Sequence, residues 1–250
     1  MIKLKDIPTQ ASKKLDKSDT KELTKQLTDR IGDLQNTLYA ERKHAVLLII
    51  QGMDGSGKDG TTRALFPACS PAGVQVYCLK KPTEEEFAHD FLWRIHKEAP
   101  QKGFIKVFNR SQYEDILIQW VHGWIDDAKR DRRMASINEF EKTLVEDNNT
   151  TIIKIMLHIS PEVQLEKLTE RTLNPRKFWK HNDDDWDERK LWNKYQSAYE
   201  YALNHSEIPW NIVAADQEWY RDFSAAKILC DALEGLNLQL PPLVSKLFKA

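Results

Sequence analysis

Five short apolar runs alternate with longer amphipathic segments along the chain. The runs cover residues 46–51, 74–79, 104–108, 152–159 and 211–214. They are apolar throughout rather than at every second position, which is typical of parallel strands covered on both faces. This alternation of strands and helices predicts an α/β fold built on a doubly wound parallel sheet of about five strands flanked by helices.

The segments between the runs carry signals for helix starts. Asp19 with Glu22 predicts the start of a helix whose apolar face holds Leu23, Leu27, Ile31, Leu34 and Leu38. Further caps are predicted at Thr83 with Glu86, Ser111 with Glu114, Ser136 with Glu139, and Ser160 before Pro161. Because the chain has no repeat and no low-complexity linker, we expect a polar arm over residues 1–18 and one domain over residues 19–250.

Composition is that of an ordinary globular protein. Of the 250 residues, 41% are hydrophobic and 30% charged, and the net charge is −1. The three cysteines have no metal-binding or CxxC spacing, so we expect reduced thiols. The N-terminus lacks an apolar leader, and no apolar run approaches the roughly 20 residues of a membrane span. These features predict a cytoplasmic protein without a membrane partner.

One motif indicates phosphate chemistry. GMDGSGKDG, residues 52–60, follows the first strand and opens a helix. Glycines let the backbone approach an anion, the helix start adds its positive end, and Lys58 supplies a mobile cation. The spacing is that of a P-loop, which predicts phosphate contacts from a set of loop residues: Gly55, Ser56, Gly57, Lys58, Asp59 and Gly60. The alternative is a glycine turn that binds nothing.

The motif departs from the usual P-loop at one position. Ser or Thr normally follows the lysine and binds Mg²⁺, but Asp59 stands there. Asp54, inside the loop, is the nearest hard oxygen ligand. A carboxylate there would repel phosphates unless a divalent cation lay between them. Asp54 is therefore a candidate metal ligand.

Ligands of such sheets bind at the carboxyl ends of the strands. Lys80 and Lys81 follow the second strand, and Asn109 and Arg110 follow the third. Each cation suits phosphate, Arg110 through a bidentate grip. Asp115 lies one turn further and is a candidate to complete a metal site with Asp54. The alternative for Asp115 is favourable placement in the first turn of a helix.

Residues 171–190, RTLNPRKFWKHNDDDWDERK, are rich in charge and contain Pro175. A helical lid that brings Arg171, Lys177 and Lys180 over a transferring phosphoryl group would have this composition. A solvated charged hairpin would look similar. A second basic cluster, from Lys80 to Lys106 with Arg130, Arg132 and Arg133, is a candidate channel for a polyanion.

Several long motifs in the same order give the chain a specific resemblance. GMDGSGKDG, EEEFAHDFLWRIH, FNRSQYEDIL and RTLNPRKFWK followed by DERKLWNKY resemble the family-2 polyphosphate kinases over about residues 20 to 235. The resemblance implies a P-loop kinase fold with a lid. It also implies Mg²⁺, with Mn²⁺ as a substitute, and transfer of the terminal phosphoryl of inorganic polyphosphate to a nucleoside mono- or diphosphate.

The resemblance is strongest to the subgroup that uses both AMP and ADP. It makes Asp54 and Asp115 candidates for metal binding and general-base work, and Lys58 and Arg110 phosphate ligands. It further makes Glu114 an acceptor-side residue and Arg171 a lid cation. The partners it implies are polyphosphate, ADP, AMP and ATP, without nucleic acid, in a homo-oligomer to which the apolar tail over residues 238–248 is a candidate contributor. The tail packing on its own core is the alternative.

Two other functions fit parts of the sequence. An ATP-dependent kinase of a nucleotide or small metabolite would favour Ser or Thr after Lys58 and an aspartate at the end of the third strand, where Phe108 and Asn109 stand. A non-catalytic P-loop binding module or switch would need a nucleotide-sensing loop, and no NKxD element occurs.

Overall fold

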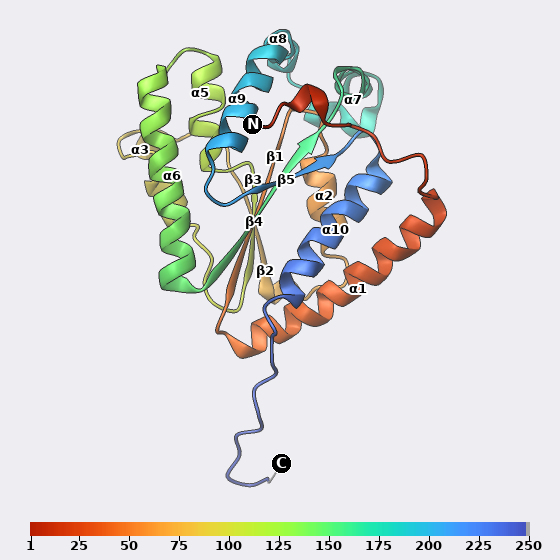
Figure 1. The fold of residues 1–250 in the computed structure, drawn as a ribbon, viewed down its shortest axis with the longest axis vertical. Coiled ribbons are helices and arrows are strands. Elements are labelled where there is room, and N and C mark those ends of the chain that lie inside the picture. Colours follow the sequence, from red (N-terminus) through yellow and green to blue (C-terminus); the bar gives the residue numbers. More distant parts are fainter. Residues whose placement is uncertain (249–250) are drawn as a thin grey trace.

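The computed structural model, which describes residues 1–248, is built around a five-stranded parallel sheet (Figure 1). The order across the sheet is β2-β3-β1-β4-β5, so β1 is central. All five expected strands are confirmed, with small shifts at their ends. The strands are β1 Ala45–Gly52, β2 Val74–Cys78, β3 Ile105–Asn109, β4 Thr150–His158 and β5 Trp210–Ala214.

The apolar runs of the three central strands reflect burial on both faces of the sheet, whereas the edge strands β2 and β5 are partly exposed. Every residue of β1 is buried, and β1 pairs in parallel with β3 and β4. In the register, Ile50 lies opposite Asn109 and Gly52 opposite Leu157, which brings the ends of three strands to one edge. This edge is where ligands of parallel sheets bind.

Helices cover both faces of the sheet, as expected for a doubly wound fold (Figure 1). One layer contains three mutually contacting helices: α1 Lys17–Glu41, α2 Lys58–Leu65 and α10 Glu218–Glu234. The other layer contains α5 Ile118–Val121, α6 Asp127–Asn148 and α9 Trp192–His205. The core between the layers and the sheet is mainly aliphatic and aromatic, and it encloses the buried ion pair of Lys154 with Glu141.

The remaining helical segments are short, apart from α7. Near the carboxyl edge of the sheet lie α7 Pro161–Leu173, the 3-10 helix η4 Pro175–Lys180 and α8 Asp184–Lys190. The segment between β2 and β3 forms α3 Glu84–Phe87 and α4 Trp93–His96. Three further 3-10 turns are η1 Leu4–Asp6, η2 Pro71–Gly73 and η3 Gln112–Asp115.

Helix starts were predicted with mixed success. The Thr83–Glu86 capping box and the Ser160 cap before Pro161 are both present. The first helix begins earlier than expected because Asp16, not Asp19, accepts the free N–H groups.

Of the two other caps, the one at Ser136 was wrong, and Ser111 is a cap only of a 3-10 turn. Ser136 lies inside α6, which Asp126 caps. Ser111 accepts a hydrogen bond from Tyr113 N and opens a 3-10 turn, because the chain tightens there rather than forming a full helical turn with Glu114.

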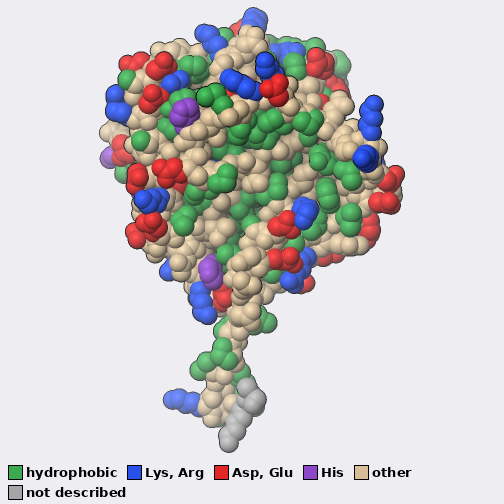
Figure 2. All heavy atoms as spheres, in the orientation of Figure 1, with side chains coloured by type: hydrophobic (Ala, Val, Ile, Leu, Met, Phe, Trp, Pro, Cys, Tyr) green, Lys and Arg blue, Asp and Glu red, His purple; other side chains and the backbone are tan. Residues whose placement is uncertain are grey.

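The two chain ends differ in packing. Near the start, Leu4 is fully buried, and its carbonyl oxygen lies 3.1 Å from His158 Nε2. The tail that follows α10 points away from the body (Figures 1 and 2). Its described apolar side chains are mostly exposed, so they do not pack on the core: Leu240, Leu243, Val244, Leu247 and Phe248. Among residues 1–248, no helix has the length and apolar character needed to cross a bilayer.

Candidate active site

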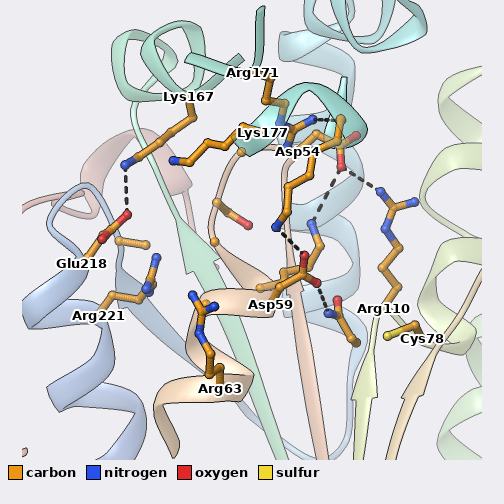
Figure 3. A pocket seen from close by; sticks show the side chains of 18 of the residues that line it. Asp54, Asp59, Arg63, Cys78, Arg110, Lys167, Arg171, Lys177, Glu218 and Arg221 are labelled. Carbon is orange, nitrogen blue, oxygen red and sulfur yellow. Dashed lines mark hydrogen bonds and ion pairs between the residues drawn. The ribbon is translucent and has the colours of Figure 1, made fainter. Parts of the chain in front are cut away.

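An arginine of the last helix, α10, packs against the P-loop. Gly57 has φ +90° and precedes α2, and a Cβ on it would lie 2.0 Å from Arg221 Nη1. Gly60, one turn later, faces the same guanidinium. Arg221 is itself buried, and Figure 3 shows it beneath the loop. Only glycine fits a left-handed position so close to a neighbouring side chain.

Asp54 lies among cations at the mouth of the loop. Its Oδ1 accepts a hydrogen bond from Arg110 Nη2 at 2.7 Å and lies 3.9 Å from Lys58 Nζ (Figure 3). Burial acts to raise the pKa of Asp54, but Lys58, Arg110 and Arg171 outweigh it and hold that pKa below its usual value. Asp54 is therefore a firmly ionised carboxylate at neutral pH.

Lys58 is oriented by its own loop. Its Nζ donates to the carbonyl oxygens of Gly52 and Met53 at 2.7 and 3.2 Å. Burial lowers the pKa of Lys58, and the charge of Asp54 opposes that shift. The ammonium group therefore lies at the P-loop, where the cation of such a motif binds phosphate.

Arg110 occupies a strained backbone position directly after β3. Its φ is +64°, which is uncommon for a residue with a side chain and is often found at functional sites. The nearby carboxylates of Glu114 and Asp54 raise the pKa of Arg110 further. The structure thus brings Asp54, Lys58, Arg110 and Glu114 together.

Asp59, the residue in place of the usual Ser or Thr, joins the P-loop to the lid segment. It accepts hydrogen bonds from Asn109 Nδ2 at 2.7 Å and from Lys180 Nζ at 3.1 Å. Burial acts to raise the pKa of Asp59, but these two partners and the charges of Lys180 and Lys58 lower it. The Asp59 carboxylate therefore connects α2 with β3 and η4. The neutral hydroxyl of a Ser or Thr at this position would offer no charge to attract Lys180.

Asp115 does not meet Asp54, contrary to the expected metal pair. Its carboxylate is 3% exposed and accepts hydrogen bonds from Arg94 at 3.1 Å and Gln119. Arg133 donates to its backbone oxygen at 2.7 Å. Arg94 also donates to the carbonyl of Lys80 at 2.9 Å. Because η3 turns this side chain toward α4, Asp115 faces the interior rather than the P-loop.

Two cavities meet at Asp54, Arg110 and Asp185. The larger, of about 760 Å³, extends over the P-loop between α2, η4 and α10. Ten basic and six acidic side chains line it, and among the described lining residues none is aromatic. The smaller, of about 50 Å³, lies on the other side of Asp54. Four carboxylates and Arg110 line it, and its apolar and aromatic lining residues are Met53, Ile118, Tyr195 and Tyr199.

The larger cavity brings together the cations that the sequence placed at the site. Lys80, Lys81, Arg110, Arg171, Lys177 and Lys180 line the larger cavity, as do the P-loop residues.

The expected polyanion channel does not continue along its sequence cluster. Lys106 pairs with Glu98 at 2.5 Å, and Arg130 pairs with Asp131 at 2.9 Å. Arg132 is not among the residues that line a described cavity. Strand pairing and helix packing commit these side chains elsewhere.

Three cavity cations were missed by sequence reasoning: Arg63, Lys167 and Arg221. They come from α2, α7 and α10, which are distant in sequence, so no local motif marks Lys167 or Arg63. The pair Gly57 and Gly60, one helical turn apart, was a usable signal that another group approaches α2 closely. Tyr195 and Tyr199 of the smaller cavity were also missed, although they share one helix face at a spacing of four residues.

The expected lid consists of the end of α7, η4 and α8. Arg171 pairs with Asp185 and also donates to the carbonyl of Lys180. Burial raises the pKa of Asp185, and Arg171 opposes that rise. Arg171 therefore joins all three helical segments above the P-loop.

The residues fit a divalent cation that arrives with its substrates. Among residues 1–248, no group of three or more carboxylate, histidine or cysteine side chains is placed to hold a metal ion. Asp54 is the P-loop carboxylate that faces both cavities. Mg²⁺ commonly takes one or two carboxylates and completes its shell with water and substrate phosphates, and this donor set suits that arrangement.

A glycine loop at the carboxyl edge of a parallel sheet, with its lysine under a cation-rich cavity, defines a phosphotransferase of the P-loop kinase class. Comparison with known proteins specifies this class further. The model of the family described as Polyphosphate kinase 2 (PPK2) matches residues 14–241. The chain belongs to that family, which confirms the resemblance seen in the motifs.

Individual relatives agree with this assignment. The chain is 44% identical over 218 residues to an AMP/ADP-polyphosphate phosphotransferase of Meiothermus ruber, covering 86% of this chain and 81% of the relative. It is 37% identical to an ADP-polyphosphate phosphotransferase of Rhodopseudomonas palustris, covering 88% and 81%. A crystal structure of polyphosphate kinase 2 from Arthrobacter aurescens superposes with a TM-score of 0.93 at 41% identity, covering 97% of this chain and 88% of that one.

Proposed function

We propose that this protein transfers the terminal phosphoryl group of inorganic polyphosphate to ADP and AMP, reversibly and with Mg²⁺. The observation that carries the proposal is the contrast between the two cavities. The described lining of the larger one is rich in cations and has no aromatic side chain, which suits a phosphate chain without a base. The smaller one offers tyrosines and apolar side chains, which suit a nucleoside.

The shared residues of the two cavities lie where donor and acceptor phosphates would meet. Lys58, Arg110 and Arg171 offset the charge of the passing phosphoryl group, which is the main need of such a transition state. Asp54 and its neighbours would hold the divalent cation, which when bound would offset negative charge on the phosphates. Since one anhydride forms as another breaks, the transfer is near thermoneutral and concentrations set its direction.

The lid belongs to this proposal. The smaller cavity, at about 50 Å³, is far below the 300–1,000 Å³ typical of ligand pockets. Asp185 and Glu188 of α8 line it, so movement of α8 would enlarge it. We propose that the segment over residues 171–190 opens to admit the nucleotide and closes over the phosphates.

We propose a positioning role for Asp115. Its interior ion pair with Arg94 supports a positioning role, since Arg94 also holds the carbonyl of Lys80. The turn that carries Arg110 and Glu114 is thereby joined to the loop after β2. The protein is proposed to act in the cytoplasm, where nucleotides are available and its three free cysteines stay reduced.

A direct assay tests the proposal. Purified protein is incubated with polyphosphate, Mg²⁺ and either ADP or AMP, without ATP, and nucleotides are separated by chromatography. We expect ATP from ADP, ADP from AMP, and loss of both products with a chelator that excess Mg²⁺ reverses. Phosphorylation of the acceptor only when ATP is the donor would instead favour an ATP-dependent kinase.

A further inference from the structure

A third cavity lies beside the one over the P-loop. It measures about 920 Å³ and is formed by the first half of α1, the end of α2 and the start of α10. We refer to it as the α1 groove. Its lining includes three lysines, two threonines and one tryptophan: Lys17, Lys21, Lys25, Thr24, Thr28 and Trp219.

The lysines of the α1 groove form a regular basic stripe. They recur every four residues, so they share one face of α1 and are separated by about 6 Å along the helix axis. Within residues 1–248, none of the three takes part in an ion pair. In the cavity over the P-loop, by contrast, Lys167 pairs with Glu218 and Lys177 pairs with Glu170. The stripe therefore presents uncompensated positive charge.

The α1 groove is continuous with the cavity over the P-loop. Ala64, Glu218 and Asp222 line both, and Arg63 of the larger cavity is adjacent to Ala64 in α2. The two carboxylates at this junction already have cationic partners. Glu218 pairs with Lys167 at 2.9 Å and Asp222 with Arg221 at 2.8 Å. A polyanion passing the junction thus meets neutralised acids and then a new row of cations.

We propose that the α1 groove binds the distal part of a long polyphosphate chain whose reacting end lies at the P-loop. This inference rests on the proposed function and adds a binding surface to it. A flexible polyanion with an unpaired cation at each helical turn gains affinity from every added contact. Short chains end before the junction, so the groove acts only on long donors.

Charge removal from the stripe tests the proposal. The variant Lys17→Gln/Lys21→Gln/Lys25→Gln is compared with Lys43→Gln/Lys129→Gln/Lys142→Gln, which removes the same charge from exposed lysines outside the described cavities. Each is assayed with long-chain polyphosphate and with tetrapolyphosphate as donor. A filter-binding assay with long-chain polyphosphate, without nucleotide, gives a readout independent of turnover.

The groove variant is expected to raise KM for long-chain polyphosphate roughly tenfold at low ionic strength and to weaken its binding similarly, with the difference fading at high salt. Its KM for tetrapolyphosphate and for ADP should stay unchanged. Equal KM and binding in the two triple variants would overturn the inference, as would an equal rise for both donors. Absence of product from wild-type protein with either donor would instead refute the proposed function.

Discussion

At the residue scale, two aspartates with equal standing in the sequence have opposite settings in the structure. Asp54 lies at the junction of two cavities among cations, with a lowered pKa. Asp115 lies in the interior, where burial raises its pKa even though Arg94 and Arg133 oppose the rise. We propose that the first takes part in the chemistry and that the second holds the site together.

Replacing Asp54 should affect activity and spare the fold. For Asp54→Ala we expect kcat to fall by about 10²–10³, the range seen when one preorganised charge-stabilising group is lost. The melting temperature should stay close to that of wild type. Asp147→Ala, which alters an exposed aspartate on α6, is the matched control. Wild-type turnover in Asp54→Ala would remove this residue from the mechanism.

Replacing Asp115 should affect the fold first. Asp115→Ala leaves the buried Arg94 with only the more distant carboxylate of Glu86, at 3.8 Å, and breaking a buried pair typically costs about 3–5 kcal/mol of unfolding free energy. Denaturant titration measures this loss. We also expect reduced activity, which should be partly recovered in Asp115→Asn because the amide oxygen still accepts hydrogen bonds. An unchanged denaturation midpoint in Asp115→Ala would contradict this role.

The lowered pKa of Asp54 has a consequence for stability in acid. A carboxyl whose folded pKa lies below its unfolded value stabilises the fold above the unfolded value, and this contribution is lost as pH falls through the folded value. The unfolding free energy of wild type relative to Asp54→Asn should therefore be constant near neutral pH. The difference should close only below about 3.9, the usual aspartate pKa. If the stability difference disappeared near pH 6 instead, the surrounding cations would not lower the pKa of Asp54.

At the element scale, the site depends on contacts between the segments that follow the strands and helices distant in sequence. The P-loop joins β1 to α2, and Arg221 of α10 fills the space that a side chain at position 57 would need. The lid depends on Arg171, which connects α7 with η4 and α8. Both connections use an arginine to fix segments that have little apolar surface of their own.

Gly57→Ala tests the close approach of α10 to the P-loop. The added Cβ would collide with the buried Arg221 guanidinium, and the alanine backbone would have to keep an unfavourable positive φ. We expect kcat/KM for polyphosphate to fall at least tenfold with a loss of about 1–3 kcal/mol in stability. Gly123→Ala is the control, since its φ is also positive but nothing lies within 4 Å of its added Cβ. Equal effects of the two substitutions would show that backbone strain alone is responsible.

Arg171→Ala tests the lid. Loss of the pair with Asp185 should loosen η4 and α8 while α7 stays folded. Hydrogen exchange of residues 175–190 is expected to accelerate, with a lower kcat and a higher KM for nucleotide. Lys190→Ala, in an exposed pair with Asp187, is the control on the same segment. Unchanged exchange in Arg171→Ala would separate this arginine from lid order.

At the scale of the whole molecule, the exposed tail stands out. Figure 2 shows that it leaves the body, and five apolar side chains on it are between 59% and 92% exposed. Apolar surface displayed in this way usually marks an interaction site. We propose that the tail contributes to self-association of the protein.

Truncation after Gln239 tests this role. The described part of the deleted segment, residues 240–248, is not among the residues that form or pack on the core, so the unfolding midpoint at low protein concentration should be unchanged. The species in solution should shift to a smaller mass in light scattering. A deletion of residues 1–3, which removes Lys3 and its pair with Glu200, is a control that leaves the tail intact. An unchanged mass would exclude the tail from assembly.

The fold was largely predictable because its signals are local. Apolar runs such as 46–51 identify strands, and GMDGSGKDG identifies the P-loop by spacing alone. Helix starts were less predictable, as Ser136 and Asp19 show, because Asp126 and Asp16 offered competing caps a short distance away. In the site, Lys58 followed from the spacing of the P-loop and Arg110 from its place directly after the third strand.

The sequence by itself determined the sheet, the phosphate loop and the family, because each depends on periodicity or on residues adjacent in the chain. The tertiary structure alone decided which charged side chains share a cavity. Arg221 reaches the P-loop, Lys17 faces a groove, and Asp115 turns inward, in each case because packing of distant helices sets the direction of a side chain. The physical reason is that charges act through space, over distances that the order of residues does not encode.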